Sequence, residues 1–152
     1  AARDFAQNQL LPGVIDRDRD MIYPTEQVKM MGEMGFLGMM VSPEYGGGGM
    51  DTLSYVLAME EISKVDASCS VIMSVNNSLV CWGLEKYGNE DQKQRYLVPQ
   101  ARGEKYAMFG LTEPGVGSDV AAMASTARAA RPAGHSHHGH AAWWSCSARK
   151  SA

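Results

Sequence analysis

Cysteine is scarce in this sequence, and its positions give no disulfide or metal-site pattern. The 152 residues include only three cysteines, Cys69, Cys81 and Cys146. An odd number at these spacings matches neither paired disulfides nor the Cys-x-x-Cys repeats of zinc sites. Free thiols persist in reducing compartments, so we expect either a bacterial cytoplasm or the mitochondrial matrix. The first residues, Ala1 to Phe5, do not read as a signal peptide, which agrees with that expectation.

Acidic residues are absent from the last 25 positions, although the rest of the chain is acidic. Residues 1–127 hold 10 basic residues against 17 acidic ones, a net charge of −7. Residues 128–152 hold four basic residues and no acid. The overall net charge of −3 argues against general nucleic-acid binding. The change of composition near residue 128 indicates a tail whose origin differs from that of the preceding chain.

No charged residue occurs between Asp66 and Glu85, a run of 18 residues. Such a length approaches that of a membrane span. The run also contains several serines and asparagines, which make it too polar for that role: Ser68, Ser70, Ser74, Asn76, Asn77 and Ser78. We therefore expect a buried helix of a helical bundle, and no membrane association.

Apolar residues recur at helical spacing through the first hundred positions. Asp51 or Thr52, and later Asn89, are expected helix N-caps, while Gly35 and Gly103 mark helix ends. The connector after the first helix is highly charged, and the glycine run at 46–49 is expected to be a flexible linker. The pattern predicts five helices, near residues 1–11, 24–35, 51–62, 67–82 and 89–103, with the connector at 14–23.

The pattern changes after residue 104. Residues 105–111 are short, apolar and aromatic, and they lead into a Pro-Gly turn, which predicts a buried strand. Residues 120–128 are a second strand candidate. The predicted fold is therefore mainly α. It consists of a helical domain at residues 1–104, the first strand or two of an incomplete β domain at 105–128, and a tail at 129–152 that is frame-shifted or disordered.

The segment GLTEPGVGSD, residues 110–119, can carry chemistry. Pro114-Gly115 suits the middle of a type II turn, in which the glycine takes a positive φ. Gly117 permits close approach of a ligand, and successive backbone N–H groups there, with the Ser118 hydroxyl, can hold phosphate oxygens. Thr112 can present its hydroxyl or N–H group to a planar ring.

Spacing alone does not decide between a bare turn and a ligand site in this segment. It is not a Rossmann fingerprint, because Val120 stands where the last glycine of G-x-G-x-x-G would be. It is not a P-loop either, because no Gly-Lys-Ser/Thr follows. A bare turn after a strand is the commoner meaning of such a pattern.

Four stretches resemble the acyl-CoA dehydrogenase family. "YAMFGLTEPGVGSDVAAMASTAR" resembles its flavin-binding strand and loop, while "AMEEISKVDASCSVIMSVNNSL" and "EKYGNEDQKQRYL" resemble its helical domain. "MGEMGFLGMMVSPEYGGGGMD" resembles the approach to the third helix. The likeness runs in order from about residue 3 to residue 128, and "SVNNSL" is similar to the short-chain, butyryl-CoA-type members.

The resemblance implies a flavoprotein oxidoreductase of fatty acid β-oxidation that binds FAD and an acyl-CoA thioester. In this family a glutamate removes the α proton while a hydride passes from the β carbon to flavin N5, which gives the trans-2-enoyl-CoA. An electron-transfer flavoprotein then reoxidises the flavin, and the full-length enzymes are tetramers. Carried over by position, Phe109, Leu111 and Thr112 would lie against the isoalloxazine ring, Gly117 and Ser118 would approach the pyrophosphate, and Ser118 would also touch the acyl-CoA.

The family's catalytic glutamate belongs to a C-terminal helical domain with no counterpart in this sequence. No catalytic residue is therefore assigned, and we expect the chain alone to be inactive. Two other classes of function stay open. One is a non-catalytic helical interaction module, and the other is a relative that uses dioxygen, such as an acyl-CoA oxidase or a flavin monooxygenase.

Several conspicuous residues have plainer interpretations. Glu60 and Glu61 are expected at a polar edge or in an inter-helix pair, and the first two cysteines as small buried residues. The histidines of the tail form at most a weak metal-binding tract, so no metal site is predicted. Met73, Ser74 and Asn77 either line an acyl pocket or simply pack between helices. The methionines expected to fill the core are Met30, Met31, Met34, Met39 and Met40.

The tail suggests a reading-frame change. Trp143-Trp144 requires the bases TGGTGG, and a shifted frame through the following codons permits Val-Val-Leu-Leu-Gly-Thr-Lys. That run resembles the "V-L-x-G-x-K" stretch that the family carries after its second strand. Our hypothesis is a frame shift near residues 128–133 of an ordinary family member. The nucleotide sequence tests it, because stop codons or unrelated residues in the alternate frame would refute it.

Overall fold

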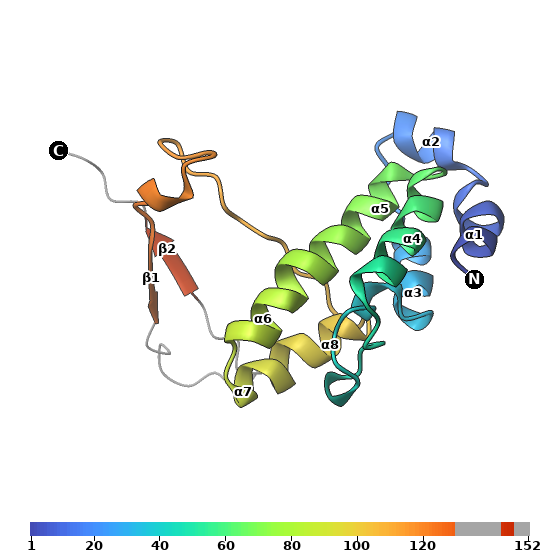
Figure 1. Ribbon diagram of the computed structural model, residues 1–152. Helices are drawn as coiled ribbons and strands as arrows, with labels where there is room; N and C mark the ends of the chain where they lie inside the picture. The colour runs from blue at the N-terminus through green and yellow to red at the C-terminus, as the bar shows by residue number, and fades with distance from the viewer. Residues whose placement is uncertain (130–143, 148–152) are drawn as a thin grey trace, which may run out of the picture. The chain divides into compact units, whose positions relative to one another are not determined.

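The computed structural model describes residues 1–129 and 144–147. Two compact units divide the chain, the first spanning Ala1–Phe109 and the second beginning at Gly110 (Figure 1). The four histidines, and most of the tail to which the frame-shift hypothesis applies, lie outside the described residues. The two units are described separately below.

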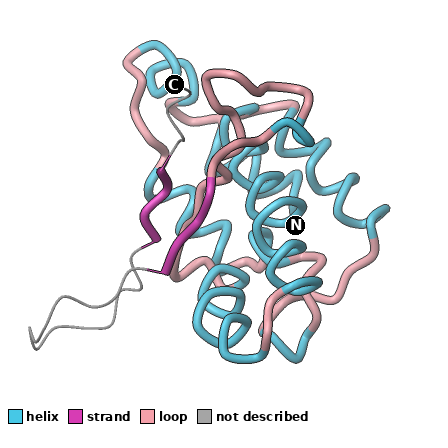
Figure 2. Tube along the Cα trace, turned by 90° about the vertical axis from the view of Figure 1, so that its left-hand side faces the viewer, coloured by secondary structure: helices cyan, strands magenta, loops and turns pink. Residues whose placement is uncertain are grey.

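The first unit is a bundle of helices (Figure 2). Three of its helices include a π-helical segment. The α4 and α5 helices pack against each other, and α1 packs on α4. The elements are α1 (Ala2–Phe5) with its π-helical continuation (Ala6–Leu10), α2 (Val14–Arg19), α3 (Thr25–Glu33), α4 (Thr52–Ser63), α5 (Ala67–Ser74) leading through Val75–Cys81 into α6 (Trp82–Tyr87), and α7 (Glu90–Gln92) leading through Lys93–Leu97 into α8 (Val98–Ala101).

All five helices that the sequence predicts are present, and a sixth was missed. Residues 14–23, expected to be a charged connector, contain the α2 helix. Gly13 takes a left-handed conformation (φ +75°), which lets the chain turn sharply out of the preceding helix. The Arg17 guanidinium then donates to the carbonyl oxygens of Leu10 (2.6 Å) and Pro12 (2.9 Å). Arg17 of α2 thus pairs with carbonyl groups at the end of the preceding helix that would otherwise lack a partner. This pairing stabilises α2 despite its charge.

Side-chain caps fix the beginnings of the long helices. The Asp51 carboxylate accepts from the Ser54 amide at 2.7 Å, as predicted. Asn89 and Gln92 form a reciprocal capping box at the start of α7, and Gly103 (φ +71°) follows the end of α8. Asp66 caps α5 by accepting from the Cys69 amide at 3.0 Å. The predicted Asp51 and Asn89 caps are therefore confirmed.

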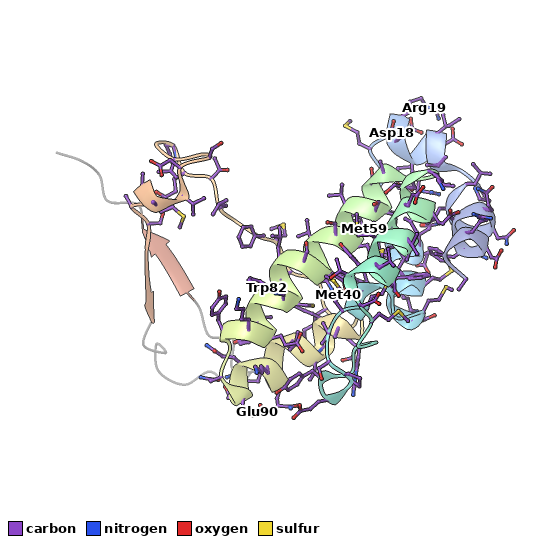
Figure 3. All side chains as sticks on the ribbon, in the orientation of Figure 1. Asp18, Arg19, Met40, Met59, Trp82 and Glu90 are labelled. Atoms are coloured by element: carbon purple, nitrogen blue, oxygen red, sulfur yellow. The ribbon has the colours of Figure 1, made fainter. Side chains whose placement is uncertain are left out.

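The main core lies between α1, α3, α4 and α5. Phe5 and Phe36 pack as a tilted aromatic pair, with ring centroids 5.6 Å apart. Met40 and Met59 pack at the edge of this core (Figure 3). Met34 does not join it, because 47% of its surface is exposed at the end of α3. The core prediction is thus wrong for that methionine. The fully buried residues of the main core include Leu10, Val28, Met31, Leu37, Ile62 and Met73.

The glycine run at 46–49 is a packed loop, so its interpretation as a flexible linker was wrong. Gly46 and Gly49 take positive φ values of 82° and 58°, which L side chains rarely adopt. A Cβ atom on Gly47 would overlap the carbonyl oxygen of Val41. Close packing against the preceding turn therefore explains the glycines. Backbone hydrogen bonds complete the loop: Gly48 to Gly38 (2.9 Å), Gly49 to Val41 (2.8 Å) and Met50 to Met39 (2.8 Å).

The continuous helix Ala67–Tyr87 has 21 residues and, by length and composition only, is apolar enough to cross a membrane. Its polar side chains are instead used inside the bundle. Asn76 donates to the carbonyls of Leu37 (2.7 Å) and Gln100 (3.2 Å), and Asn77 donates to the carbonyl of Phe36 (2.8 Å). Both asparagines are buried. These bonds join the long helix to two other segments of the bundle, which is what a core helix requires.

The structure corrects both predicted strands. Residues 106–112 are irregular, and no described residue pairs with them as a neighbouring strand. A strand needs a partner for its N–H and C=O groups, so an apolar composition alone did not suffice. The second candidate, 120–128, is a 3₁₀ turn at Val120–Ala122 followed by β1 (Thr126–Ala129). The β1 strand pairs antiparallel with β2 (Trp144–Ser147), with Thr126 opposite Ser147.

Candidate functional site

A tight turn forms the start of the candidate ligand loop. The backbone N–H of Glu113 donates to the Val116 carbonyl, and the Val116 N–H donates to the Glu113 carbonyl, both at 3.0 Å. Pro114 and Gly115 occupy the two central positions, as predicted. Gly115 does not have a positive φ, however, so the expected type II turn was wrong. Type I geometry has negative φ at both central positions, and proline suits the first of them.

The carboxylate of Glu113 binds the backbone at the far end of the loop. One oxygen, Oε2, accepts from the Ala124 N–H at 3.0 Å, and the other, Oε1, accepts from the Ser125 N–H at 2.9 Å. Hydrogen bonding from Ser125 and then from the Ala124 amide lowers the pKa of Glu113 below its ordinary value. The ionised form is therefore the form that the loop favours.

Three successive backbone amides lie between these two fixed ends. Within the described residues, the N–H groups of Gly117, Ser118 and Asp119 donate to no protein acceptor. All three residues are exposed, and a Cβ on Gly117 would meet open space. Val116 is the only residue of the 110–125 segment that is buried, with 7% of its surface exposed. The loop thus presents unused hydrogen-bond donors on an anchored backbone.

The residues predicted to contact a flavin are accessible. Leu111 is half-buried, whereas Thr112 and Ser118 are exposed. Phe109, with 50% of its surface exposed, is the last residue of the first unit. The other predicted residues belong to the second unit, where Gly117 and Ser118 are adjacent in the anchored loop. Contacts of all five with a ligand stay a prediction.

The donor set of the loop fits the group that the sequence resemblance implies. FAD combines a planar apolar ring with a doubly charged pyrophosphate, so its site needs exposed apolar side chains and hydrogen-bond donors. Within the second unit, the half-buried Leu111 supplies an apolar side chain. The free amides at 117–119 and the Ser118 hydroxyl supply the hydrogen-bond donors, in the manner of backbone anion-binding concavities. The residues present are therefore suitable for FAD.

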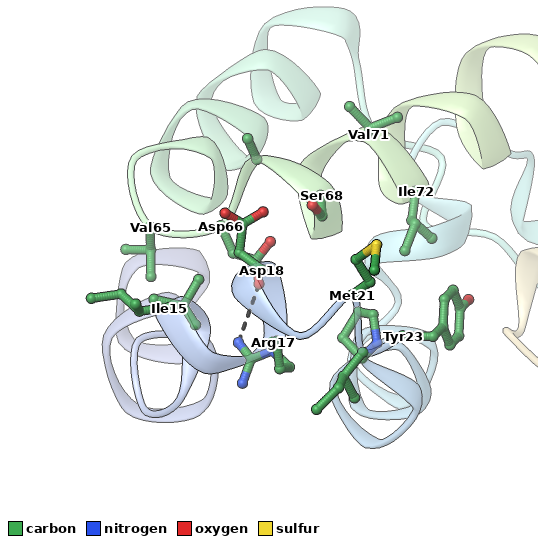
Figure 4. A pocket seen from close by; sticks show the side chains of 14 residues that line it. Ile15, Arg17, Asp18, Met21, Tyr23, Val65, Asp66, Ser68, Val71 and Ile72 are labelled. Atoms are coloured by element: carbon green, nitrogen blue, oxygen red, sulfur yellow. Dashed lines mark hydrogen bonds and ion pairs between the residues drawn. The ribbon is translucent and has the colours of Figure 1, made fainter.

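A groove of about 970 Å³ lies elsewhere, within the first unit (Figure 4). It runs between α2, the following loop and the start of α5, and it is lined mainly by apolar side chains. Arg17 and Asp66 form an ion pair at 3.2 Å in its wall, where both are largely buried. None of the predicted flavin-contacting residues lines this groove.

The cysteines of the first unit have no catalytic character. Cys69 and Cys81 are both fully buried, as the sequence predicted. Burial raises the thiol pKa of each to about 12, so neither forms a thiolate at neutral pH. Among the side chains that the structure describes, no three His, Cys, Asp or Glu residues are grouped so that they could hold a metal ion.

The predicted inter-helix role of the paired glutamates is confirmed for Glu61. Its carboxylate accepts from Arg3 of α1 at 2.7 Å and from Lys64 at 2.9 Å. These hydrogen bonds, the one from Arg3 above all, lower the pKa of Glu61 to about 2. Both carboxylate oxygens are engaged with cations, so Glu61 is unsuited to accept a proton near neutral pH.

Sequence reasoning missed Glu113. No role for this residue followed from the sequence. The partners of its carboxylate, Ala124 and Ser125, lie 11 and 12 residues further along the chain. No local spacing rule connects a carboxylate with backbone amides at that distance. The only signal was an acidic residue within a segment already chosen for its glycines.

Comparisons with known proteins agree with the helical bundle. The family described as "Acyl-CoA dehydrogenase, N-terminal domain" matches residues 1–104. Mouse mitochondrial short-chain specific acyl-CoA dehydrogenase is 49% identical over 126 residues, which cover 83% of this chain and 31% of the mouse protein. The chain therefore spans about a third of the length of the curated relatives it matches.

Solved structures show the same likeness. Butyryl-CoA dehydrogenase from Megasphaera elsdenii is similar, with a TM-score of 0.76 at 38% identity, over 83% of this chain and 34% of that one. An acyl-CoA dehydrogenase from Bacillus anthracis complexed with FAD has a TM-score of 0.76 at 35% identity, over 85% of this chain and 22% of that one. Relatives of this kind are oxidoreductases. On the family match and these likenesses together, this chain belongs to the acyl-CoA dehydrogenase family and carries the family's N-terminal domain.

Proposed function

We propose that this chain is the N-terminal part of a short-chain acyl-CoA dehydrogenase, in which the 109–118 segment contributes to binding of FAD and an acyl-CoA thioester. The observation that carries the proposal is the row of free amides at Gly117, Ser118 and Asp119 on an anchored loop. The similarity to named short-chain and butyryl-CoA dehydrogenases supports the substrate class.

The role of the chain's own residues is to bind and orient. The amides of Gly117, Ser118 and Asp119, with the Ser118 hydroxyl, donate hydrogen bonds to pyrophosphate oxygens, and Ser118 also contacts the acyl-CoA. Phe109, Leu111 and Thr112 exclude water from one side of the ring and set its position. When bound, FAD supplies the acceptor of the hydride that leaves the substrate's β carbon. Orientation of two reactants is a large part of such catalysis.

The base that removes the α proton is not assigned to any residue here. We therefore propose that turnover to the trans-2-enoyl-CoA in fatty acid β-oxidation requires the parts of the relatives that this chain does not span. We further propose an electron-transfer flavoprotein as the redox partner and a tetramer as the complete assembly. The location is the mitochondrial matrix or a bacterial cytoplasm, in keeping with the names of the relatives.

Flavin titration of the purified chain tests this proposal. FAD fluorescence should be quenched on binding, and Ser118→Ala should weaken FAD binding about threefold to tenfold, the effect of one hydrogen bond. Ser68→Ala, which removes an exposed serine of the helical unit, is the matched control and should leave the affinity unchanged. Equal affinities for Ser118→Ala and wild type would count against a cofactor role for this loop.

A further inference from the structure

We infer that Glu113 is a positioning residue for ligand binding: its carboxylate holds the 114–123 loop in the shape that displays the amides of Gly117, Ser118 and Asp119. The inference rests on the proposed function, because it is this loop that is assigned to the cofactor. It adds a role for a residue that was not among the predicted contacts. Glu113 itself need not touch the ligand.

Glu113 makes hydrogen bonds at both ends of the loop. Its backbone N–H and C=O form the reciprocal pair with Val116, both at 3.0 Å, which closes the turn at the entrance. Its two carboxylate oxygens accept from Ala124 (3.0 Å) and Ser125 (2.9 Å), which fixes the exit. One residue therefore fixes two points that are eight or nine residues apart in the chain.

Few other interactions hold this loop. Val116 is its only buried side chain, so apolar packing contributes little to its shape. The 3₁₀ turn at Val120–Ala122 adds local bonds from Ala122 to Asp119 and from Met123 to Val120. Among the side chains that the structure describes, none forms an ion pair with Glu113. Its charge is instead directed to the amides of Ala124 and Ser125 and to the Ser125 side chain, and hydrogen bonds to a charged acceptor are stronger than those to a neutral one.

The consequence concerns preorganisation. A loop of ten residues between fixed ends samples far fewer conformations than a free one, so less entropy is lost when a ligand orders it. The three unused amides then stand ready for an anion without competition from the Glu113 carboxylate, which is committed to Ala124 and Ser125. Removal of that carboxylate should weaken anion binding although no direct ligand contact is removed.

The first test needs no ligand. Amide hydrogen exchange should be measured by NMR for the full 152-residue chain and for Glu113→Ala, Glu113→Gln and Glu104→Ala. In Glu113→Ala, protection of the Ala124 and Ser125 amides should fall about tenfold, the effect of losing charge-assisted hydrogen bonds. Glu113→Gln keeps one acceptor oxygen, so its amide protection should be intermediate between that of Glu113→Ala and that of wild type. Glu104→Ala, which removes an exposed glutamate of the first unit, should match wild type.

The second test asks whether the hydrogen bonds from Ala124 and Ser125 to the Glu113 carboxylate affect ligand binding. Dissociation constants for FAD, and for riboflavin, which lacks the pyrophosphate, should be measured with the same four proteins. Glu113→Ala should bind FAD about tenfold more weakly, and its affinity for riboflavin should be unchanged, because the Glu113 carboxylate acts through the amides that bind phosphate. Glu113→Gln should recover part of the lost FAD affinity. Unchanged protection of the helical bundle in each variant shows that the protein is folded.

The outcomes separate this inference from the proposed function. Unchanged protection at Ala124 and Ser125 in Glu113→Ala would overturn the inference, whatever happens to flavin binding. Lost protection with unchanged FAD affinity would overturn it too, because the loop's shape would then not matter to the ligand. If the wild-type chain failed to bind FAD while the Ala124 and Ser125 amides were protected, the proposed function would be contradicted. The role of Glu113 would then be to stabilise the loop only.

Discussion

The helical unit and the 110–125 segment keep their shapes by different means. The helical unit buries two clusters of apolar side chains and uses buried polar groups such as Asn76 and Asn77 internally. The 110–125 segment buries only Val116, and it depends on a few hydrogen bonds centred on Glu113. Stability in the first region therefore comes mainly from apolar burial, whereas shape in the second comes from polar contacts at two points.

The difference matches what each region is proposed to do. The buried groups of the helical core are shielded from solvent, so they cannot meet a ligand. An exposed loop that is fixed at its ends leaves donors free at Gly117, Ser118 and Asp119, which a flexible loop would not hold in place. Changes in the core should therefore affect folding, and changes in the loop should affect binding.

The largest expected effect is in the core. Leu37→Ala removes a fully buried side chain and should lower the free energy of unfolding by about 2–5 kcal/mol. Leu53→Ala removes the same atoms from a side chain that is 68% exposed, so the free energy of unfolding should change by less than about 0.5 kcal/mol. Urea denaturation followed by circular dichroism compares the two. Similar losses would show that the helical unit does not derive its stability from this core.

Substitution of one buried valine in each region by alanine compares the two regions directly. Val28→Ala, in the core, should cost about 2 kcal/mol of unfolding free energy, because a fully buried side chain loses two methyl groups. Val116→Ala should leave the melting of the helices unchanged, and should only increase amide exchange in the 113–116 turn. Thermal denaturation and NMR hydrogen exchange measure these quantities. Cooperative loss of the helices in Val116→Ala would contradict the separation of the two regions.

Much of the helical unit could be predicted from the sequence, because its signals are local. Helix caps and apolar periodicity depend on residues within one or two turns of each other, as at Asp51 and Asn89. The α2 helix was missed because its stabilising contact, Arg17 with the carbonyls of Leu10 and Pro12, comes from the preceding segment. The glycine loop at 46–49 was misjudged because its packing partner, Val41, is known only from the fold.

The candidate site was less predictable. The positions of Pro114, Gly117 and Ser118 follow from the turn chemistry of glycine and proline, so the loop itself could be found. Its conformation could not, because Gly115 avoids the positive φ that a type II turn needs, and a carboxylate bound to Ala124 and Ser125 fixes the rest. The predicted strand at 105–111 had the composition of a strand, but strand structure depends on a partner that composition does not specify.

The smallest expected effect is an acid-dependent one at the surface of the bundle. Hydrogen bonds from Arg3 and Lys64 lower the pKa of Glu61 from 4.5 to about 2. A depressed carboxyl pKa contributes stability that is present above pH 4.5 and is lost as the pH falls toward 2. Urea midpoints at pH 5, 4 and 3 should therefore fall more steeply for wild type than for Glu61→Gln.

Glu60→Gln is the control for that titration, because among the described side chains the Glu60 carboxylate pairs with Lys64 and not with Arg3 of α1. It should follow the wild-type curve. Parallel curves for wild type and Glu61→Gln would show that the contact between α1 and α4 does not depend on this carboxylate.

The central claim is that the amides at Gly117, Ser118 and Asp119 bind the pyrophosphate of FAD. Its most direct test is the change in their NMR chemical shifts during titration of the chain with FAD and, separately, with riboflavin. We expect saturable shifts at these three amides with FAD and none with riboflavin at the same concentration. No shift with FAD, or equal shifts with both ligands, would contradict it.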